Sequence, residues 1–373
     1  MPKEVYNPKI NYFYKVLKFI LKRFSYGILV LLGVIVIVFF LFNVLPGDPA
    51  RMMLGQRADI SSVESIRKEL GVDRPMHVRF FNYLNDLSPL SIHNHKNNDS
   101  FFYLDKDKYT YTPLVTIKNH SVVIKYPYMG KSYQSNRPVT QILISVFPNT
   151  LLLATVSILF AMFAGIILGI FSALNNHKII SKIILVFSIS GMSVPSFFAA
   201  ILIAWLFAFV LGDHTGLNMT GSLWEVDDFG RGEYMNWRNL ILPALTLGIR
   251  PLAIVTELTR SSLLNVLQQD YIRTAKAKGL SFYRVITRHA LKNAMNPVIT
   301  AISGWFASLM AGAVFVEFVF DWKGIGVVIV DALENYDFPL IMGAVLIISI
   351  MLVIINIAVD IVYGLLDPRV RIN

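Results

Sequence analysis

The chain of 373 residues contains no cysteine, and charged residues make up only 16% of it. The absence of cysteine excludes disulfides, thiolate nucleophiles and zinc sites with cysteine ligands. The G-x-S-x-G and H-E-x-x-H patterns of hydrolases are missing as well. With no catalytic group in evidence, the sequence does not predict an enzyme.

Three short stretches match known site motifs only in part. "GKS" at Gly130–Ser132 ends like a phosphate-binding loop, but Lys125 stands where the first glycine of that motif is required. "HNH" at His93–His95 has no further metal ligand at a useful spacing. "GMSVPS" at Gly191–Ser196 lacks both a second glycine and a partner histidine. We therefore expect this chain to bind neither a metal nor a cofactor.

Long apolar runs dominate what is present, since 55% of the residues are hydrophobic. A bilayer core of about 30 Å requires roughly 20 apolar residues per helix. Six runs reach this length, so the sequence predicts an all-α polytopic membrane protein. The predicted spans are Phe24–Leu45, Gln141–Leu174, Ile183–Leu211, Leu240–Leu267, Met295–Phe320 and Pro339–Leu366.

Lysine and arginine follow the topology that six spans imply. Segments 1–23, 175–182, 268–294 and 367–373 carry 16 basic residues, whereas the short loops 212–239 and 321–338 carry three. Basic residues concentrate in short cytoplasmic loops, and long loops are exempt from this rule. We therefore expect both termini in the cytoplasm and the long loop 46–140 on the other side of the membrane.

This topology defines the expected domains. Residues 1–45 form the N-terminus and first span, 46–140 an extracytoplasmic loop, 141–366 a core of five spans, and 367–373 a cytoplasmic tail. Within the loop, the pattern predicts a short amphipathic helix around Val63–Leu70 and a small β element in "TPLVTIKNHSVVIKYPY".

Small residues recur every four positions in two of the runs. Ala161, Gly165, Gly169 and Ala173 share one helix face, and so do Gly304, Ser308 and Gly312. Such stripes let helix backbones approach closely in lipid. The contact is either packing within the chain or an interface with another subunit.

Charged residues inside the apolar runs are candidates for function. Arg250 lies near the middle of the fourth run, where facing lipid would cost roughly 2.5–3.5 kcal/mol. Glu257 follows roughly 10 Å along the helix, and Arg260 is placed to pair with Glu257. Arg250, Glu257 and Glu317 either line a polar translocation path or belong to an internal ion-pair network.

A basic segment, Asp270–Asn293, separates the fourth and fifth runs. It carries six basic residues and a single acid. Gly279 is suited to end a helix that begins at Asp270, because glycine tolerates the left-handed conformation after a helix. A second helix from Phe282 leads back into the bilayer. The segment is therefore predicted to be a helix, a break and a helix on the membrane surface.

The ordered motifs of the chain resemble those of a known family. They are "LPGDPA", "GKSYQSNRPV", "GMSVPSFF", "LPALTLG", "LTRSSLL", "DYIRTAKAKGLSFYRVITRHALKNAMNPVIT", "VFVEFVFDWKGIG" and "VDIVYGLLDPRVR". Together they resemble the permeases of binding-protein-dependent ABC importers, specifically the first permease subunit of the dipeptide/oligopeptide/nickel branch. An insertion near residues 87–128 departs from the usual pattern of these permeases.

The resemblance implies the type I ABC importer (MetI-like) fold and a role for the basic segment 268–294. In such permeases this segment is a coupling helix that inserts into a cleft of an ATPase subunit. Arg273 and Thr274 depart from the Glu-Ala that begins the general pattern, whereas Ala275 and Gly279 match it. The implied coupling residues are Tyr271, Arg273, Thr274, Ala275, Ala277, Gly279 and Leu280.

The resemblance also implies partners for the chain. These are a second homologous permease, two ABC ATPase subunits that bind ATP and Mg²⁺, and an extracytoplasmic solute-binding protein. Di- and oligopeptides are the expected substrates, and nickel or other small solutes are the alternative. Two rival functions stay open: a secondary transporter driven by an ion gradient, and a membrane-anchored scaffold built around the outer loop.

Overall fold

The structure is a computed structural model that describes residues 8–44, 50, 59–69, 71, 73–95, 102–105, 108–175, 178–227 and 229–366. Most of "LPGDPA" and the predicted tail 367–373 lie outside these residues. The chain divides into two compact units. Unit 1 comprises 1–30, 146–327 and 348–373, and unit 2 comprises 31–145 and 328–347.

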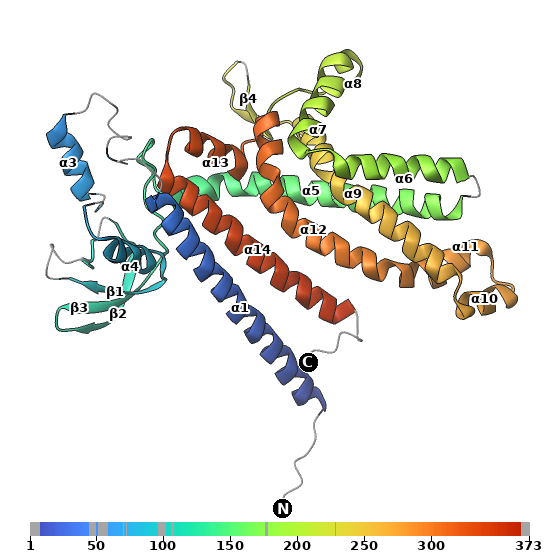
Figure 1. The fold of residues 1–373 in the computed structure, drawn as a ribbon, viewed down its shortest axis with the longest axis horizontal. Coiled ribbons are helices and arrows are strands. Elements are labelled where there is room, and N and C mark those ends of the chain that lie inside the picture. The colour runs from blue at the N-terminus through green and yellow to red at the C-terminus, as the bar shows by residue number, and fades with distance from the viewer. Residues whose placement is uncertain are drawn as a thin grey trace, which may run out of the picture. The chain divides into compact units, whose positions relative to one another are not determined.

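Helices account for most of the described residues (Figure 1). Four are long and apolar enough to cross a membrane, and the count reaches six when each of two bent helix pairs forms one span. The six predicted runs therefore all appear as helices. The long helices are α1 (Pro8–Val44), α5 (Val139–Leu174), α6 (Lys178–Ser193), α9 (Arg238–Leu267), α12 (Leu291–Phe320) and α14 (Phe338–Leu366).

The third predicted span is not one continuous helix. The helix α6 ends at Ser193, and the chain bends by 115° before α7 (Ser196–Ile203) begins. The helix α7 then continues directly into the π-helix η1 (Ala204–Val210). Pro195 explains the break, because proline donates no backbone hydrogen bond and disfavours helical backbone in the residue before it. The fifth span bends by 55° between Met310 and Ala313.

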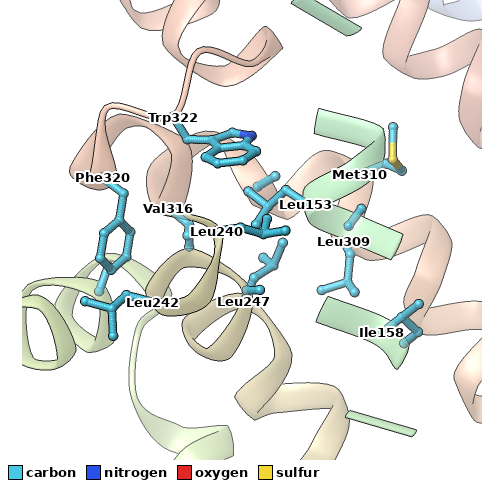
Figure 2. Close-up of a cluster of buried hydrophobic side chains, with 14 of the residues drawn as sticks. Leu153, Ile158, Leu240, Leu242, Leu247, Leu309, Met310, Val316, Phe320 and Trp322 are labelled. Atoms are coloured by element: carbon cyan, nitrogen blue, oxygen red, sulfur yellow. The ribbon is translucent and has the colours of Figure 1, made fainter. Parts of the chain in front are cut away.

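Unit 1 is built around α9, which packs against α12 and α6. Its core is an aliphatic and aromatic cluster in which Trp322 lies over Leu153 and Leu240 (Figure 2). Trp322 is fully buried and donates a hydrogen bond from Nε1 to the carbonyl of Asn149, at 3.0 Å. The cluster joins α5, α9 and α12 at the end where α12 terminates.

The two stripes of small residues have different surroundings. A Cβ atom built on Gly165 would lie 2.8 Å from Val255 Cγ1, and one built on Gly169 would lie 2.5 Å from Thr259 Cβ. The first stripe therefore serves packing of α5 against α9 within the chain. A Cβ atom on Gly304 meets nothing within 4 Å, so the second stripe is open at that residue.

Three shorter elements complete unit 1. The helix α8 (Gly212–Thr215) is followed by a hairpin of β4 (Trp224–Val226) and β5 (Glu233–Met235). Between α9 and α12 lie α10 (Asp270–Ala277), α11 (Phe282–Arg284) and the π-helix η2 (Val285–Ala290). The predicted helix, break and helix over the basic segment is confirmed.

Unit 2 contains an antiparallel sheet of order β1–β3–β2. Its strands are β1 (Leu90–Asn94), β2 (Tyr111–Ile117) and β3 (His120–Lys125), so the predicted β element is a hairpin with one further strand. The predicted helix around Val63–Leu70 appears as α3 (Ile60–Glu69). The helix α4 (Met76–Leu87) has no counterpart among the sequence predictions. The helix α13 (Ile325–Glu334) begins in unit 1 and ends in unit 2.

Candidate functional site

The helix α10 is a short helix with a defined start and stop. Gln269 precedes it in extended backbone, and its carbonyl accepts the first hydrogen bond of the helix from Ile272 N, at 3.0 Å. Gly279 follows it with φ of +73°, and Leu280 N donates back to the carbonyl of Ala275. This is the left-handed glycine stop that the sequence predicts.

One side of α10 packs against the other helices of unit 1. Ile272 is fully buried and Ala275 nearly so. They pack in a cluster with residues from three long helices, α5, α9 and α12. The other buried members are Leu263, Val285, Ala290 and Ala294, and Ile170, Ala173, Leu174, Val266, Leu267, Leu280 and Met295 pack against them.

The opposite side of α10 is open to solvent. Among the seven predicted coupling residues, Ala275 is buried and Leu280 is half-buried, so these two hold the helix to the bundle. The other five are exposed: Tyr271, Arg273, Thr274, Ala277 and Gly279. The hydroxyl of Tyr271 also accepts a hydrogen bond from Asn293 Nδ2, at 2.9 Å, which ties α10 to α12.

The six basic residues of this segment all have exposed side chains. Arg273 Nη1 lies 3.5 Å from Asp270 Oδ1, both highly exposed, so the pair adds little stability. The segment therefore presents a positively charged surface with small residues at its centre. Such a surface suits docking to another protein better than it suits burial within the chain.

The π-helix η2 joins α11 to α12, and the sequence pattern does not predict it. Three β-branched residues in succession, Val285, Ile286 and Thr287, weaken regular α-helix there. The hydroxyl of Thr287 bonds to the carbonyl of Tyr283, at 2.8 Å. Single π turns inside helices recur at functional sites, and this one is in contact with α10.

A cavity of about 70 Å³ lies where α6 breaks into α7. Arg250 of α9 lines it, together with Ser196, Thr246 and Ser308, and Trp305 forms part of its apolar wall. The break at Pro195 is therefore what opens this space. Polar groups from three helices converge on an otherwise apolar pocket, as they do in ligand sites.

The three residues predicted for a translocation path are not brought together at this cavity. Only Arg250 lines it. Glu257 is exposed elsewhere on α9, and no ion pair joins it to Arg260 in the part of the chain that the structure describes. Glu317 is fully buried, and its Oε2 accepts a hydrogen bond from Gly326 N, at 2.6 Å.

The surroundings of Glu317 explain the glycines of "DWKGIG". A Cβ atom on Gly324 would collide with the Glu317 carboxylate, and one on Gly326 would lie 2.5 Å from Val314 Cα. Both glycines are therefore needed for the turn between α12 and α13. Within the described residues, no group of three or more His, Asp or Glu could hold a metal ion.

Long apolar helices, a mostly apolar cavity lined by Arg250 and an exposed basic helix fit a subunit of a membrane transporter. The family described as "Binding-protein-dependent transport system inner membrane component" matches residues 165–372, and its N-terminal family matches residues 16–96. The chain belongs to this family, which comprises transport permeases rather than enzymes. The predicted fold class and the permease function are thereby confirmed over the secondary-transporter alternative.

Relatives extend the similarity over nearly the whole chain. The glutathione transport permease GsiC of Salmonella typhimurium is 33% identical, covering 95% of this chain and 99% of the relative. The di/tripeptide permease DppB of Pseudomonas aeruginosa is 31% identical with the same coverage. The probable D,D-dipeptide permease DdpB of Escherichia coli K12 is 34% identical, covering 94% and 97%. A solved structure of the MetNI methionine ABC transporter covers 61% of this chain at 13% identity, with a TM-score of 0.49.

Proposed function

We propose that this chain is half of the translocation path of an ATP-driven importer for short peptides. Its partners are a second homologous permease, two ATPase subunits that bind ATP and Mg²⁺, and an extracytoplasmic binding protein. The names of the relatives support the substrate class, because glutathione, di- and tripeptides and D,D-dipeptides are all short peptides. Nickel and other small solutes are the alternative substrates.

This proposal rests on the difference between the two sides of α10, one of which is buried in the chain while the other is exposed. Ile272 and Ala275 fasten it to a cluster that includes three long helices, while Arg273, Thr274 and Ala277 face outward. A helix held this way cannot move alone, because a close-packed cluster transmits displacement. Closure of the ATPase pair would therefore shift α5, α9 and α12 together and open the path to the other side.

The topology completes the proposal. Both termini and the basic segment 268–294 lie in the cytoplasm, and the loop 46–140 lies outside. The distribution of lysine and arginine supports this orientation. The chain is a multi-pass protein of the bacterial inner membrane, with a core of five spans over 141–366 and a cytoplasmic tail at 367–373.

Arg250 is the residue that we propose to contact substrate. A cavity of about 70 Å³ is far smaller than the roughly 300–1,000 Å³ of ordinary ligand sites, so it must widen to admit a peptide. A guanidinium at its wall can bind a peptide carboxylate in two parallel hydrogen bonds. Glu257 and Glu317 are proposed as further residues of the path, to be tested beside Arg250.

Docking of the ATPases is tested by enlarging Ala277, which is exposed and small. Ala277→Trp leaves the chain's own packing unchanged but blocks close approach of a partner to α10. The matched control is Thr220→Trp, another exposed small residue, which lies in the loop 212–239. In a mild-detergent purification, ATPase subunits should be lost with the first variant and retained with the second. Full ATPase recovery with Ala277→Trp would overturn the coupling role.

The role of Arg250 is tested separately by transport of a labelled dipeptide into vesicles. Arg250→Gln should reduce transport by about tenfold or more, the effect of losing one charged hydrogen-bonded contact of about 1.5–3 kcal/mol. ATPase subunits should still co-purify. Lys at this position should restore only part of the activity, because it cannot bind a carboxylate in two parallel bonds. Normal transport by Arg250→Gln would remove Arg250 from the path.

A further inference from the structure

The sheet β1–β3–β2 in the insertion has its polarity reversed. A sheet with one face in water normally places polar side chains on that face and apolar ones inside. Here the buried face carries polar residues, among them His93, Ser121 and Lys125. The opposite, exposed face carries six aliphatic residues, Leu90, Ile92, Val115, Ile117, Val122 and Ile124, with Thr112, Asn94 and His120 at its margins.

The strand register places these aliphatic residues on one surface. Leu90 pairs with Ile124, and Val122 lies between Ile92 and Val115 across the three strands. Successive side chains of a strand point to opposite faces, so paired positions share a face. Apart from the half-buried Val122, these side chains retain 50–64% exposure. They form a continuous patch that no described part of the chain covers.

The buried face combines the fully buried Val123 with polar residues that lie near Asp86 of α4. Asp86 accepts bonds at its carboxylate from Lys108 Nζ (2.9 Å) and the Tyr109 hydroxyl (2.5 Å), and at its carbonyl from Lys125 Nζ (2.6 Å). Burial lowers the pKa of Lys125 to about 8. The bond from Lys125 ties the buried face of β3 to α4, which leaves the aliphatic face pointing away from α4.

The helix α4 connects this sheet to a membrane span. Phe80 and Tyr83 of α4 pack on Phe39 of α1, with ring centroids 5.1 and 5.7 Å apart, and Phe80 also lies 6.0 Å from Phe40. Phe39 and Phe40 belong to the last turns of the apolar span Leu21–Asn43. The helix α4 is therefore held at the level where this span leaves the bilayer.

The exposed apolar surface continues from α1 through α4 toward the sheet. Phe40 is exposed on α1, and Phe81 is 57% exposed beside Phe80 on α4. Asn85, one turn further, bonds to both backbone groups of Ile92 in β1, at 3.3 and 3.4 Å. The sheet is thus anchored within a few residues of lipid-facing aromatic side chains.

We infer that the aliphatic face of the sheet β1–β3–β2 rests on the lipid of the outer leaflet. The centre of the face consists of aliphatic side chains, and polar residues stand only at its margins. Tyr126 is 80% exposed beside it, and tyrosine is typical of the membrane–water boundary. Interfacial elements bury their apolar face to about 5–10 Å, which matches a layer of leucine, isoleucine and valine side chains.

The assignment to the outer leaflet rests on the proposed topology, whereas contact with lipid does not. The absence of native cysteine makes both testable with single-cysteine variants of the assembled transporter. Ile92→Cys and Ile124→Cys report on the aliphatic face. Thr116→Cys is the matched control, because Thr116 is exposed in the same sheet but pairs with Ser121 of the opposite face.

Each variant is labelled with an environment-sensitive fluorophore and reconstituted in vesicles of phosphatidylethanolamine and phosphatidylglycerol. A nitroxide-labelled phosphatidylcholine then serves as the quencher. Labels at 92 and 124 should lose several times more fluorescence than the label at 116, and aqueous iodide should give the reverse order. Equal quenching at all three positions, or stronger iodide quenching at 92 and 124, would overturn the inference.

Two further outcomes separate the causes of failure. If labels at 92 and 124 were shielded from both quenchers, a protein partner would cover the face and the lipid contact would be wrong. Labelling of Thr116→Cys in intact spheroplasts by an impermeant maleimide tests the topology alone. Reaction only after lysis would refute the outer placement of loop 46–140 while leaving the quenching result valid.

Discussion

The carboxylate of Asp337 accepts a hydrogen bond from the side chain of Ser132, although 205 positions separate the two residues in the sequence. Ser132 Oγ donates to Asp337 Oδ2 at 2.5 Å, and Tyr133 N donates to Oδ1 at 3.1 Å. Both Ser132 and Asp337 are buried. Asp337 also begins α14, because its carbonyl accepts from Ile341 N. The segment "GKSY" is thereby bound to the start of the last span, so its function is structural rather than phosphate binding.

Replacement of Asp337 should destabilise this junction. Asp337→Ala leaves the Ser132 hydroxyl and the Tyr133 amide without their acceptor, at a cost of about 1.5–3 kcal/mol. Thermal denaturation of the purified protein in detergent measures the loss. The control is Asp331→Ala, because Asp331 is exposed on the neighbouring helix α13. Equal midpoints for the two variants would show that the bonds to Asp337 contribute nothing.

Gly279 should be sensitive to any side chain, for conformational reasons. Its φ of +73° costs a residue with a Cβ atom roughly 1–2 kcal/mol, although that atom would meet nothing within 4 Å. Gly279→Ala should therefore unwind the end of α10 and lower transport-coupled ATP hydrolysis, and Gly279→Pro should lower it further. Gly212→Ala is the control, since Gly212 also faces open space but lacks a positive φ. Unchanged coupling in Gly279→Ala would contradict the prediction.

Glycines of the two small-residue stripes should respond differently to alanine. In Gly169→Ala the new methyl would lie 2.5 Å from Thr259 Cβ and 2.7 Å from the Thr256 carbonyl, so α5 and α9 must separate. Overpacking of this kind costs about 1–3 kcal/mol. Gly304→Ala meets no atom of the chain and should leave the stability of the isolated subunit unchanged or slightly raised. Thermal melts of the two variants decide, and equal losses would refute the packing assignment.

The stability of the sheet β1–β3–β2 should change with pH in three ranges, set by Lys125, by two tyrosines and by His93. Burial lowers the pKa of Lys125 in the folded chain to about 8, below the ordinary lysine value of 10.5, so the unfolded chain binds more protons between these values. Stability therefore rises with pH from about 8, by at most about 1.4 kcal/mol per pH unit. Burial raises the pKa of Tyr109, and that of Tyr128 to about 12. Above the ordinary tyrosine value of 10 the unfolded chain therefore binds fewer protons than the folded one, and the stability of the folded sheet falls as the pH rises.

Pulse proteolysis of the loop in urea, repeated at each pH, checks this dependence. The variant Lys125→Met should lose the rise above pH 8 while keeping the fall above pH 10. At the acidic end, burial lowers the pKa of His93, so protonation of the unfolded state should weaken the sheet below the ordinary histidine value of 6.5. A profile for Lys125→Met that matches the native chain would show that Lys125 does not titrate as its burial implies.

Local patterns predict the helices of the basic segment 268–294 well, because the signals that start and stop them lie in neighbouring residues. The helix from Asp270, the glycine stop at 279 and the return helix from Phe282 all follow from neighbouring residues. The break at Pro195 is also a local signal, but the apolar run on both sides outweighs it in a prediction based on length. The π-helices η1 and η2 depend on how neighbouring helices pack and have no clear sequence pattern.

The candidate path residues show where sequence reasoning ends. Arg250, Glu257 and Glu317 all stand in apolar runs, and a pattern cannot separate them. In the structure Arg250 and Glu257 are both exposed, but only Arg250 lines a cavity, whereas Glu317 is buried against Gly326. The difference arises from which helix packs on which face, and that is a long-range property.

By itself, the sequence determines the membrane class, the six apolar runs, the basic segment between two of them and the family of the chain. These features depend on composition and on periodicity within a few turns of helix. Only the tertiary structure decides that Asp337 binds Ser132 and that Asp86 accepts hydrogen bonds from Lys108 and Lys125. It also decides that the aliphatic face of the sheet is the exposed one. Hydrogen bonds between distant segments select one face of each element, and periodicity alone cannot tell which face will be covered.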